Sequence, residues 1–197
     1  MNTVLASASP RRRELLTNLG IAFSVMPSDR ESAPVPGETP AETVARIALG
    51  KARDVSSRCP ADTLVIAADT LVYLDGEPLG KPSDRNEAAS MLRRLSGRTH
   101  SVLTGVALIL DGRELSRAEE TAVSFRCLSD GEIDWYIGTG EPMDKAGAYG
   151  IQGLGSVLID GINGDYFNVM GLPLCRLESM LREFGLSVTT LRGYTSI

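Results

Sequence analysis

The chain has few cysteines and almost no histidine. Its cysteines, Cys59, Cys127 and Cys175, are odd in number and widely spaced, and no two of them form a CxxC pair. This pattern argues against a disulfide framework or a zinc site and indicates free thiols in a reducing compartment. His100 is the only histidine, so a histidine metal cluster is excluded and a Ser-His-Asp triad would have to use this residue. We expect His100 to be a polar side chain at a strand edge, and we expect any acid–base catalyst to be a carboxylate or a lysine.

Long apolar runs and an excess of positive charge are also lacking. No run approaches the ~18–20 apolar residues of a membrane span, and the N-terminal sequence does not have the pattern of a signal peptide. We therefore expect a cytoplasmic protein that has no membrane contact. The formal net charge is −5 over 197 residues, which argues against a protein that coats nucleic acid. An anion that binds to this acidic chain needs a concentrated local basic site.

Helical and strand patterns alternate along the chain, with antiparallel strand pairs among them. Helices are expected at 10–19, from Thr39 to about 58, from Ser83 to Gly97, from Ser129 to about 138 and from Pro173 to about 184. Strands are expected at 3–7, 21–27, 62–74, 99–110, 118–128 and 156–162. Thr39 with Glu42, and Ser129 with Glu132, have the spacing of capping boxes. The sequence thus predicts a mixed-sheet α/β fold without the regular βαβ rhythm of a Rossmann domain.

The segment LASASPRRRELL (5–16) places three arginines where a helix begins. With Ser9 as N-cap, the arginines oppose the helix dipole, which costs about 0.3–1 kcal/mol for each exposed cation. At about 100° per residue, Arg12 points along the apolar stripe of the helix, Arg11 lies about a right angle away, and Arg13 points nearly to the opposite side. Arg11 and Arg12 with the free N–H groups therefore predict an anion site. A solvated basic turn is the alternative for these two, and it is the preferred interpretation for Arg13.

Asp69 lies in the middle of the otherwise apolar strand VIAADTLV. A carboxylate is costly to bury without a partner, so we expect Asp69 to hold Mg²⁺ or to activate a water for attack on phosphorus. Thr70 faces the opposite side of a regular strand, although a bulge would bring both residues into one site. Lys81 on a short loop and Lys51 inside a helix are candidate basic partners, with plain surface lysines as the alternative.

The segment DKAGAYGIQGLGS (144–156) is rich in glycine. It contains neither the GxxxxGK[ST] phosphate loop nor a GxGxxG that follows a strand. Its glycines allow close backbone approach to a ligand, so we expect Gln152 and main-chain groups to bind a base or sugar edge. A plain glycine loop is the alternative. Glu31, in a polar loop, is by itself typical of a surface residue.

Together these stretches resemble the Maf family of nucleoside triphosphate pyrophosphatases. The resemblance is carried by LASASPRRRELL, the glutamate of DRESA, ALGKARDV, IAADTLV, LGKP, LRRLSGRTHSVLTGVAL, GEPMDKAGAYGIQGLG and INGDYFNVMGLPL. It implies an elongated mixed-sheet α/β fold similar to inosine triphosphate pyrophosphatases. Residues 1–197 would then form one Maf-like domain, in which two lobes share an active-site cleft. The resemblance also implies a homodimer.

The resemblance further implies an activity and roles for individual residues. Such enzymes hydrolyse a nucleoside triphosphate between the α and β phosphates, with Mg²⁺ or Mn²⁺ as cofactor. Asp69 matches the proton acceptor of the family, and Glu31 matches an acidic residue that helps Asp69 to hold metal. The phosphate-binding and basic positions match Ser7, Arg11, Arg12, Lys51 and Lys81, and the positions for base selection match Arg11, Thr70 and Gln152. The stretches AADT and DKAGAYGIQG resemble the subgroup that acts on dTTP and UTP, with modified pyrimidine triphosphates as further candidates.

Two other functions stay open at this point. A regulator of cell division and septum formation would sense a nucleotide without significant turnover, and a generic phosphatase would release orthophosphate. The carboxylate of Asp69 within an apolar strand favours catalysis, because a sensor needs no group that activates water.

Overall fold

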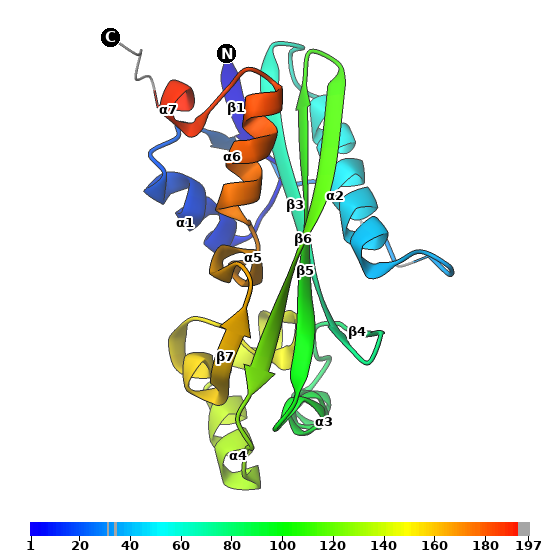
Figure 1. Ribbon diagram of the computed structural model, residues 1–197, viewed down its shortest axis with the longest axis vertical. Coiled ribbons are helices and arrows are strands. Elements are labelled where there is room, and N and C mark those ends of the chain that lie inside the picture. Colours follow the sequence, from blue (N-terminus) through cyan, green and yellow to red (C-terminus); the bar gives the residue numbers. More distant parts are fainter. Residues whose placement is uncertain (31, 34, 193–197) are drawn as a thin grey trace. The chain divides into compact units, whose positions relative to one another are not determined.

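The computed structural model describes residues 1–192 except 31 and 34 (Figure 1). The chain divides into two compact units, and each unit is built from segments that are separate in the sequence. Unit 1 comprises Met1–Asp69, Thr104–Glu119 and the segment that starts at Gly171, whereas unit 2 comprises Thr70–Leu103 and Glu120–Met170. No helix in the described part of the chain is long and apolar enough to cross a membrane.

The strands form one mixed sheet, which confirms the predicted fold class. They are β1 (Asn2–Leu5), β2 (Ser24–Val25), β3 (Thr63–Leu74), β4 (Glu77–Leu79), β5 (Thr99–Leu110), β6 (Arg113–Phe125) and β7 (Ile159–Asn163). The strand order is β2-β1-β3-β5-β6-β7, with β4 paired to β3. β1 runs parallel to β2 and β3, whereas the β3–β4 and β6–β7 pairs are antiparallel. The long strands β3, β5 and β6 each contribute residues to both units.

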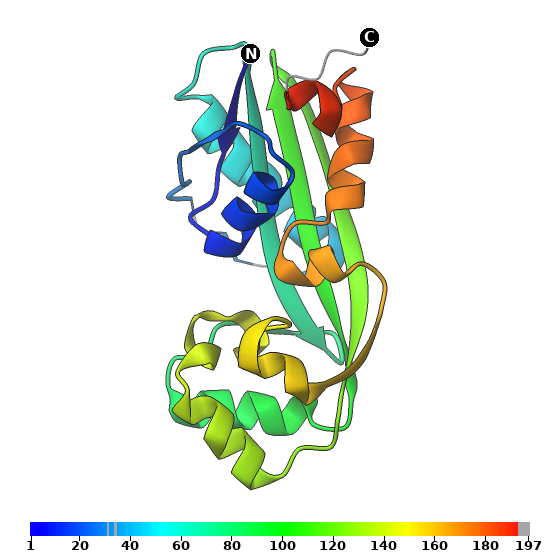
Figure 2. The same cartoon turned by 90° about the vertical axis from the view of Figure 1, so that its left-hand side faces the viewer.

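In unit 1, helices cover both faces of the strands. Helix α2 (Pro40–Ser56) lies on one face, and α1 (Pro10–Asn18) and α6 (Leu174–Glu183) lie on the other (Figures 1 and 2). The buried face of α2 packs its small side chains on those of the strands, and this cluster includes Val4, Ala48, Ala52, Val65, Ala67 and Ala107. The contact is close enough that a Cβ atom on Gly105 would lie 2.0 Å from the Val44 carbonyl oxygen. Only glycine fits at that point of β5.

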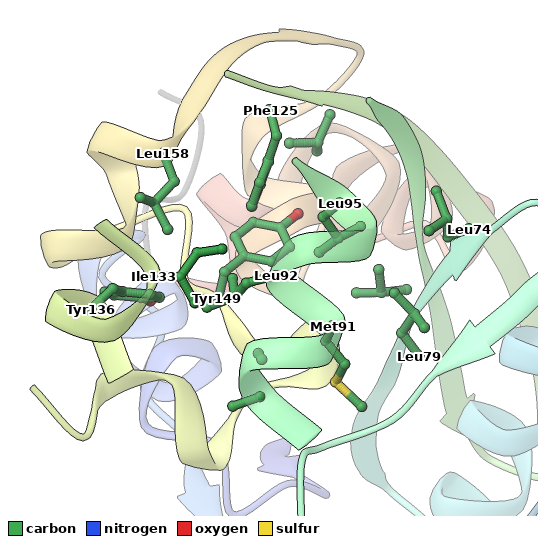
Figure 3. Close-up of a cluster of buried hydrophobic side chains, with 14 of the residues drawn as sticks. Leu74, Leu79, Met91, Leu92, Leu95, Phe125, Ile133, Tyr136, Tyr149 and Leu158 are labelled. Atoms are coloured by element: carbon green, nitrogen blue, oxygen red, sulfur yellow. The ribbon is translucent and has the colours of Figure 1, made fainter. Parts of the chain in front are cut away.

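Unit 2 has its own core, built largely from helices and short 3-10 segments. These are α3 (Arg85–Leu95), α4 (Asp130–Gly138), η1 (Glu141–Asp144), η2 (Ala146–Ala148), η3 (Gly153–Leu158) and α5 (Tyr166–Met170). Helix α3 packs against α4 and η2, as Figure 2 shows. Leu92 and Leu95 from α3 belong to this core together with Tyr136 from α4, Phe125 and Tyr149 (Figure 3).

His100 lies inside this second core, so the expectation of a strand-edge side chain was wrong. Only 3% of the residue is exposed. Its Nε2 atom lies 2.7 Å from the Tyr149 hydroxyl oxygen, and its ring packs edge-to-face on Phe125 and Tyr149. Burial lowers the pKa of His100 to about 4, so the ring is neutral at neutral pH. The hydroxyl partner is what allows a polar ring at this position.

The helix-capping predictions were confirmed at three of four helices, and Ser9 is the N-cap of α1 as expected. Thr39–Glu42 and Ser129–Glu132 form capping boxes at α2 and α4. At α3 the N-cap is Asp84 rather than Ser83, because the Asp84 carboxylate accepts the Glu87 N–H at 2.8 Å. Because serine and aspartate are both good N-cap residues and are adjacent here, the sequence alone locates the N-cap only to within one position.

Three expected strands differ from the structure. The strand expected at 118–128 is β6, which already begins at Arg113 and ends at Phe125. The strand expected at 21–27 is reduced to β2, an edge strand that pairs with β1 at only two positions. The strand expected at 156–162 begins as η3 and becomes β7 only at Ile159. Two short helices, α5 and α7 (Val188–Leu191), were not predicted. One turn of helix is too short for its apolar spacing to stand out in a sequence.

Candidate active site

The first turn of α1 places the side chain of Arg12 inside unit 1. Ser9 is the N-cap, and its hydroxyl accepts the Arg12 N–H at 3.5 Å. The Arg12 guanidinium donates from Nε to the Gly171 carbonyl oxygen at 2.7 Å and from Nη1 to the Ser7 hydroxyl at 3.0 Å. The Ser7 hydroxyl also accepts the Ser9 N–H at 3.3 Å. These bonds hold the cation at the start of the helix, where Pro10 has no N–H and the N–H groups of Arg12 and Arg13 already bond to Ser9.

The surroundings of Arg12 on balance disfavour its positive charge. Burial lowers the pKa of Arg12 to about 10, the negative charge of Asp69 partly opposes this effect, and the positive charge of Arg11 adds to it. At neutral pH the guanidinium is still protonated. The first turn of α1 contains no acidic residue, so a bound anion would relieve the repulsion between the two arginines.

The three arginines differ in exposure as the helix geometry predicts. Arg11 and Arg12 are partly buried, whereas Arg13 is exposed. Within the described residues, Arg11 makes no hydrogen bond or ion pair, which leaves its guanidinium available to a ligand. The functional roles assigned to these arginines stay predictions.

Asp69 on β3 forms an ion pair with Lys51 on α2. The Lys51 ammonium donates to Asp69 Oδ1 at 2.5 Å, and the side chains are 23% and 15% exposed, respectively. The carboxylate is thus mostly buried but paired, which offsets the cost that an isolated charge would carry. Among residues 1–192 without 31 and 34, no group donates a hydrogen bond to the second oxygen, Oδ2.

The acidic residues that the structure describes do not form a metal cage. The described part of the chain contains no group of three or more histidine, cysteine, aspartate or glutamate residues that could hold a metal ion. Glu31, which we expected to share a metal with Asp69, lies outside the described residues. Mg²⁺ is commonly held by one or two carboxylates together with substrate phosphates. The single carboxylate of Asp69 fits a metal that shares its ligands with a polyphosphate.

The remaining predicted site residues belong to unit 2. Thr70 follows Asp69 along β3 and is partly buried. Lys81 is exposed on the loop after β4, and in the part of the chain that the structure describes it makes no hydrogen bond or ion pair. The carbonyl of Gly80 accepts the N–H of Gly147 at 3.0 Å. This bond ties the Lys81 loop to the start of the glycine-rich segment.

The predicted residues therefore form two groups, one in each unit. Unit 1 contains Ser7, Arg11, Arg12, Lys51 and Asp69, and unit 2 contains Thr70, Lys81 and Gln152. Sequence reasoning missed Gly171, whose carbonyl orients Arg12. The available signal was the segment GLP, in which Gly171 has a φ of 108° and lets the chain turn.

The comparisons with known sequences all point to one family. The model of a family described as Maf-like protein matches residues 2–184. A dTTP/UTP pyrophosphatase of Symbiobacterium thermophilum is 56% identical to this chain over 187 residues, which cover 95% of this chain and 96% of the relative. A dTTP/UTP pyrophosphatase of Moorella thermoacetica is 52% identical, and the match covers 94% of this chain and 96% of the relative.

A solved structure is also similar. The structure of the Staphylococcus aureus Ham1 protein aligns with a TM-score of 0.48 at 16% sequence identity, over 81% of this chain and 80% of that chain. A likeness at this level says nothing about function.

Proposed function

Because the chain belongs to the Maf-like protein family, we propose that it is a nucleoside triphosphate pyrophosphatase that hydrolyses dTTP and UTP to the nucleoside monophosphate and pyrophosphate. Relatives that are 56% and 52% identical carry that activity in their names. The observation that carries the proposal is the mostly buried Asp69 carboxylate, paired with Lys51 in the unit that also holds the inward-facing Arg12. A carboxylate suited to activate water and cations suited to bind a polyphosphate thus lie in the same unit, which supports the proposal.

Arg12 and Arg11, with the backbone N–H of Arg11 at the start of α1, bind the triphosphate. The negative phosphates remove the repulsion that the two guanidinium groups experience without a ligand. Ser7 acts through Arg12, because its hydroxyl already accepts a hydrogen bond from the Arg12 guanidinium. Lys81, exposed and without an internal partner among the described residues, supplies a further positive charge to the phosphates.

Asp69 accepts the proton of the attacking water. The water oxygen forms a bond to the α phosphorus, the bond from the α phosphorus to the bridging oxygen breaks, and pyrophosphate leaves with the electron pair. The Lys51 ammonium lies on Asp69 Oδ1. When the Lys51 ammonium donates to a phosphate oxygen instead, Asp69 Oδ1 is free to accept the proton of the water. The ammonium then stabilises the negative charge on the leaving pyrophosphate.

Asp69 and Glu31 would hold a divalent cation, Mg²⁺ or Mn²⁺, together with phosphate oxygens. When bound, this cation neutralises charge on the phosphates and on the leaving pyrophosphate. Thr70, Gln152 and Arg11 select the base, with modified pyrimidine triphosphates as further substrates. The proposal also includes one domain with a cleft shared by two lobes, a homodimer, and a cytoplasmic location.

The test is an assay of the purified protein with a panel of canonical and base-modified triphosphates and Mg²⁺. We expect monophosphate and pyrophosphate from dTTP and UTP. Release of orthophosphate would instead indicate a phosphatase, and tight binding without turnover would indicate a nucleotide sensor.

The Asp69→Asn variant tests the mechanism within the same assay. We expect kcat to fall by about 10²–10⁴-fold, because the amide cannot take the proton of the water. Asp62→Asn is the matched control, since Asp62 is exposed directly before the same strand. Full activity of Asp69→Asn would contradict the assigned role.

A further inference from the structure

The glycine-rich segment is held at both ends of the stretch that carries Gln152. Before this stretch, Tyr149 is buried in the core of unit 2, and the N–H of Gly150 donates to the Tyr136 hydroxyl oxygen at 3.1 Å. After it, the N–H groups of Leu154 and Gly155 both bind Glu141. Ile151, Gln152 and Gly153 therefore span two fixed points.

The carboxylate of Glu141 is the acceptor at the second end of the stretch, and it also binds Tyr136. Its Oε1 accepts the Gly155 N–H at 3.0 Å and the Tyr136 hydroxyl at 2.9 Å, and its Oε2 accepts the Leu154 N–H at 3.0 Å. Tyr136 thus links both ends of the stretch, because it donates to Glu141 and accepts from Gly150. It is fully buried on α4, near Tyr149 and Ile133 (Figure 3).

Glu141 is itself fixed and charged. Its N–H donates to the Thr139 hydroxyl at 3.1 Å, and its carbonyl accepts from the Lys145 ammonium at 2.6 Å. Burial raises the pKa of the Glu141 carboxyl, but the bonds from Gly155, Leu154 and Tyr136 outweigh this effect and lower the pKa overall. A charged acceptor in a fixed place is well suited to hold backbone N–H groups.

The backbone around Glu141 has no room for larger residues. Gly153 has a φ of 69°, and a Cβ atom on it would lie 2.8 Å from Glu141 Oε2. A Cβ on Gly155 would lie 2.4 Å from the Gly150 carbonyl oxygen and 2.5 Å from the Tyr136 hydroxyl oxygen. The glycines therefore allow the loop to fold closely over the two side chains.

In contrast with this network, the Gln152 side chain has no partner. It is partly buried, and within the described residues its amide makes no hydrogen bond. A fixed backbone that carries an amide with open donor and acceptor positions is suited to recognise the edge of a base.

We propose that Glu141 is a positioning residue for base selection: with Tyr136, its carboxylate fixes Gly150–Gly155 so that the Gln152 amide meets the base in one orientation. The inference rests on the proposed function and extends it, because it assigns selectivity to a residue that does not touch the substrate. Glu141 acts through Gln152, whereas phosphate binding by Arg12 is independent of it.

The experiment compares Glu141→Gln with the wild-type protein. Glutamine keeps the size of the side chain but offers one acceptor oxygen where the network uses two. We expect KM for dTTP and UTP to rise about tenfold and kcat to change by less than about twofold, since the contact to the base is weakened equally in the ground state and in the transition state. The preference for dTTP over dATP, as a ratio of kcat/KM values, should fall about tenfold. Inhibition by inorganic tripolyphosphate, which has no base, should stay unchanged.

A double-mutant cycle separates positioning from general weakening. Gln152→Ala alone should lose the same selectivity, and Glu141→Gln with Gln152→Ala should lose no more than either single variant. Tyr136→Phe should shift selectivity in the same direction, and it provides the answer if Glu141→Gln does not fold. Glu132→Gln is the matched control: it removes a carboxylate charge from α4 by the same substitution, and Glu132 bonds to Ser129 and Arg126 rather than to Gly150–Gly155.

The possible outcomes distinguish this inference from the proposed function. If the wild-type protein releases pyrophosphate but Glu141→Gln keeps its base preference, the inference is wrong and the function stands. Losses that multiply in the double variant would likewise show that Glu141 acts independently of Gln152. If the wild-type protein releases no pyrophosphate from any triphosphate, the proposed function fails and the inference fails with it.

Discussion

At the scale of single residues, neighbouring arginines on one helix turn have different surroundings. Arg12 is partly buried and bonded to Gly171 and Ser7, whereas Arg13, one position along, is exposed. The same charge can therefore contribute to ligand binding at one position and only to solubility at the next.

This difference predicts the effect of two alanine substitutions. Arg12→Ala should lower kcat/KM for dTTP by about 100-fold, because the charge-assisted contact to phosphate that we propose for Arg12 would be lost. Arg13→Ala should change it by less than about twofold. Steady-state kinetics on both variants, with thermal midpoints to check folding, provide the measurement. Equal losses would show that the orientation of these side chains does not determine their role.

His100 predicts a pH dependence of stability. Its pKa is about 4 in the folded protein and about 6.5 in an unfolded chain, so the unfolded state binds more protons between these values. Stability is therefore complete above pH 6.5 and decreases as the pH falls toward 4, by about 3 kcal/mol in total. His100→Gln, which does not titrate, should remove this part of the decrease.

The measurement for His100 is straightforward because the chain has one histidine. Urea unfolding of the wild-type protein and of His100→Gln between pH 7 and pH 5 gives the difference in stability. NMR of the single imidazole gives its pKa in the folded state. An imidazole that titrates near 6.5 in the folded protein would contradict the prediction.

At the scale of secondary-structure elements, the contact of α2 with β5 depends on one glycine. Gly105→Ala should lower the free energy of unfolding by about 3 kcal/mol or more, because the added methyl group meets the backbone of α2 and not a flexible side chain. Gly131→Ala in α4 is the control: a Cβ there meets nothing within 4 Å, so stability should stay equal or rise by up to about 1 kcal/mol. Thermal unfolding of both variants tests this, and a Gly105→Ala protein of normal stability would contradict it.

Elements with local chemical signals could be predicted from the sequence, and those that depend on tertiary contacts could not. Thr39 and Ser129 bind residues three positions along, so their helices were located correctly. The length of β2 depends on its pairing with β1, and the burial of His100 depends on Tyr149, which is 49 residues away.

In the candidate site, Asp69 was predicted from its apolar strand. The bonds from Leu154 and Gly155 to Glu141 cross 13 and 14 residues and leave no periodic pattern.

At the scale of the whole molecule, the strands β3, β5 and β6 continue from one compact unit into the other. Neither unit is a contiguous piece of chain, so we expect both units to unfold in one cooperative transition. Trp135 is the only tryptophan and lies on α4 in unit 2, so its fluorescence reports on that unit alone. Its unfolding midpoint should coincide with that of far-ultraviolet circular dichroism. Two separate midpoints would contradict this prediction.

The division of the chain also determines an order of events during synthesis on the ribosome. Unit 1 uses the first 69 residues and then needs the segment that starts at Gly171. At ~5–20 residues per second, the intervening stretch of about 100 residues takes roughly 5–20 s to make. All of unit 2 emerges before that last segment, so its core can close first. Until Gly171 has been made, Arg12 in α1 lacks this carbonyl as a partner, so it obtains that hydrogen bond only after all of unit 2 has been synthesised.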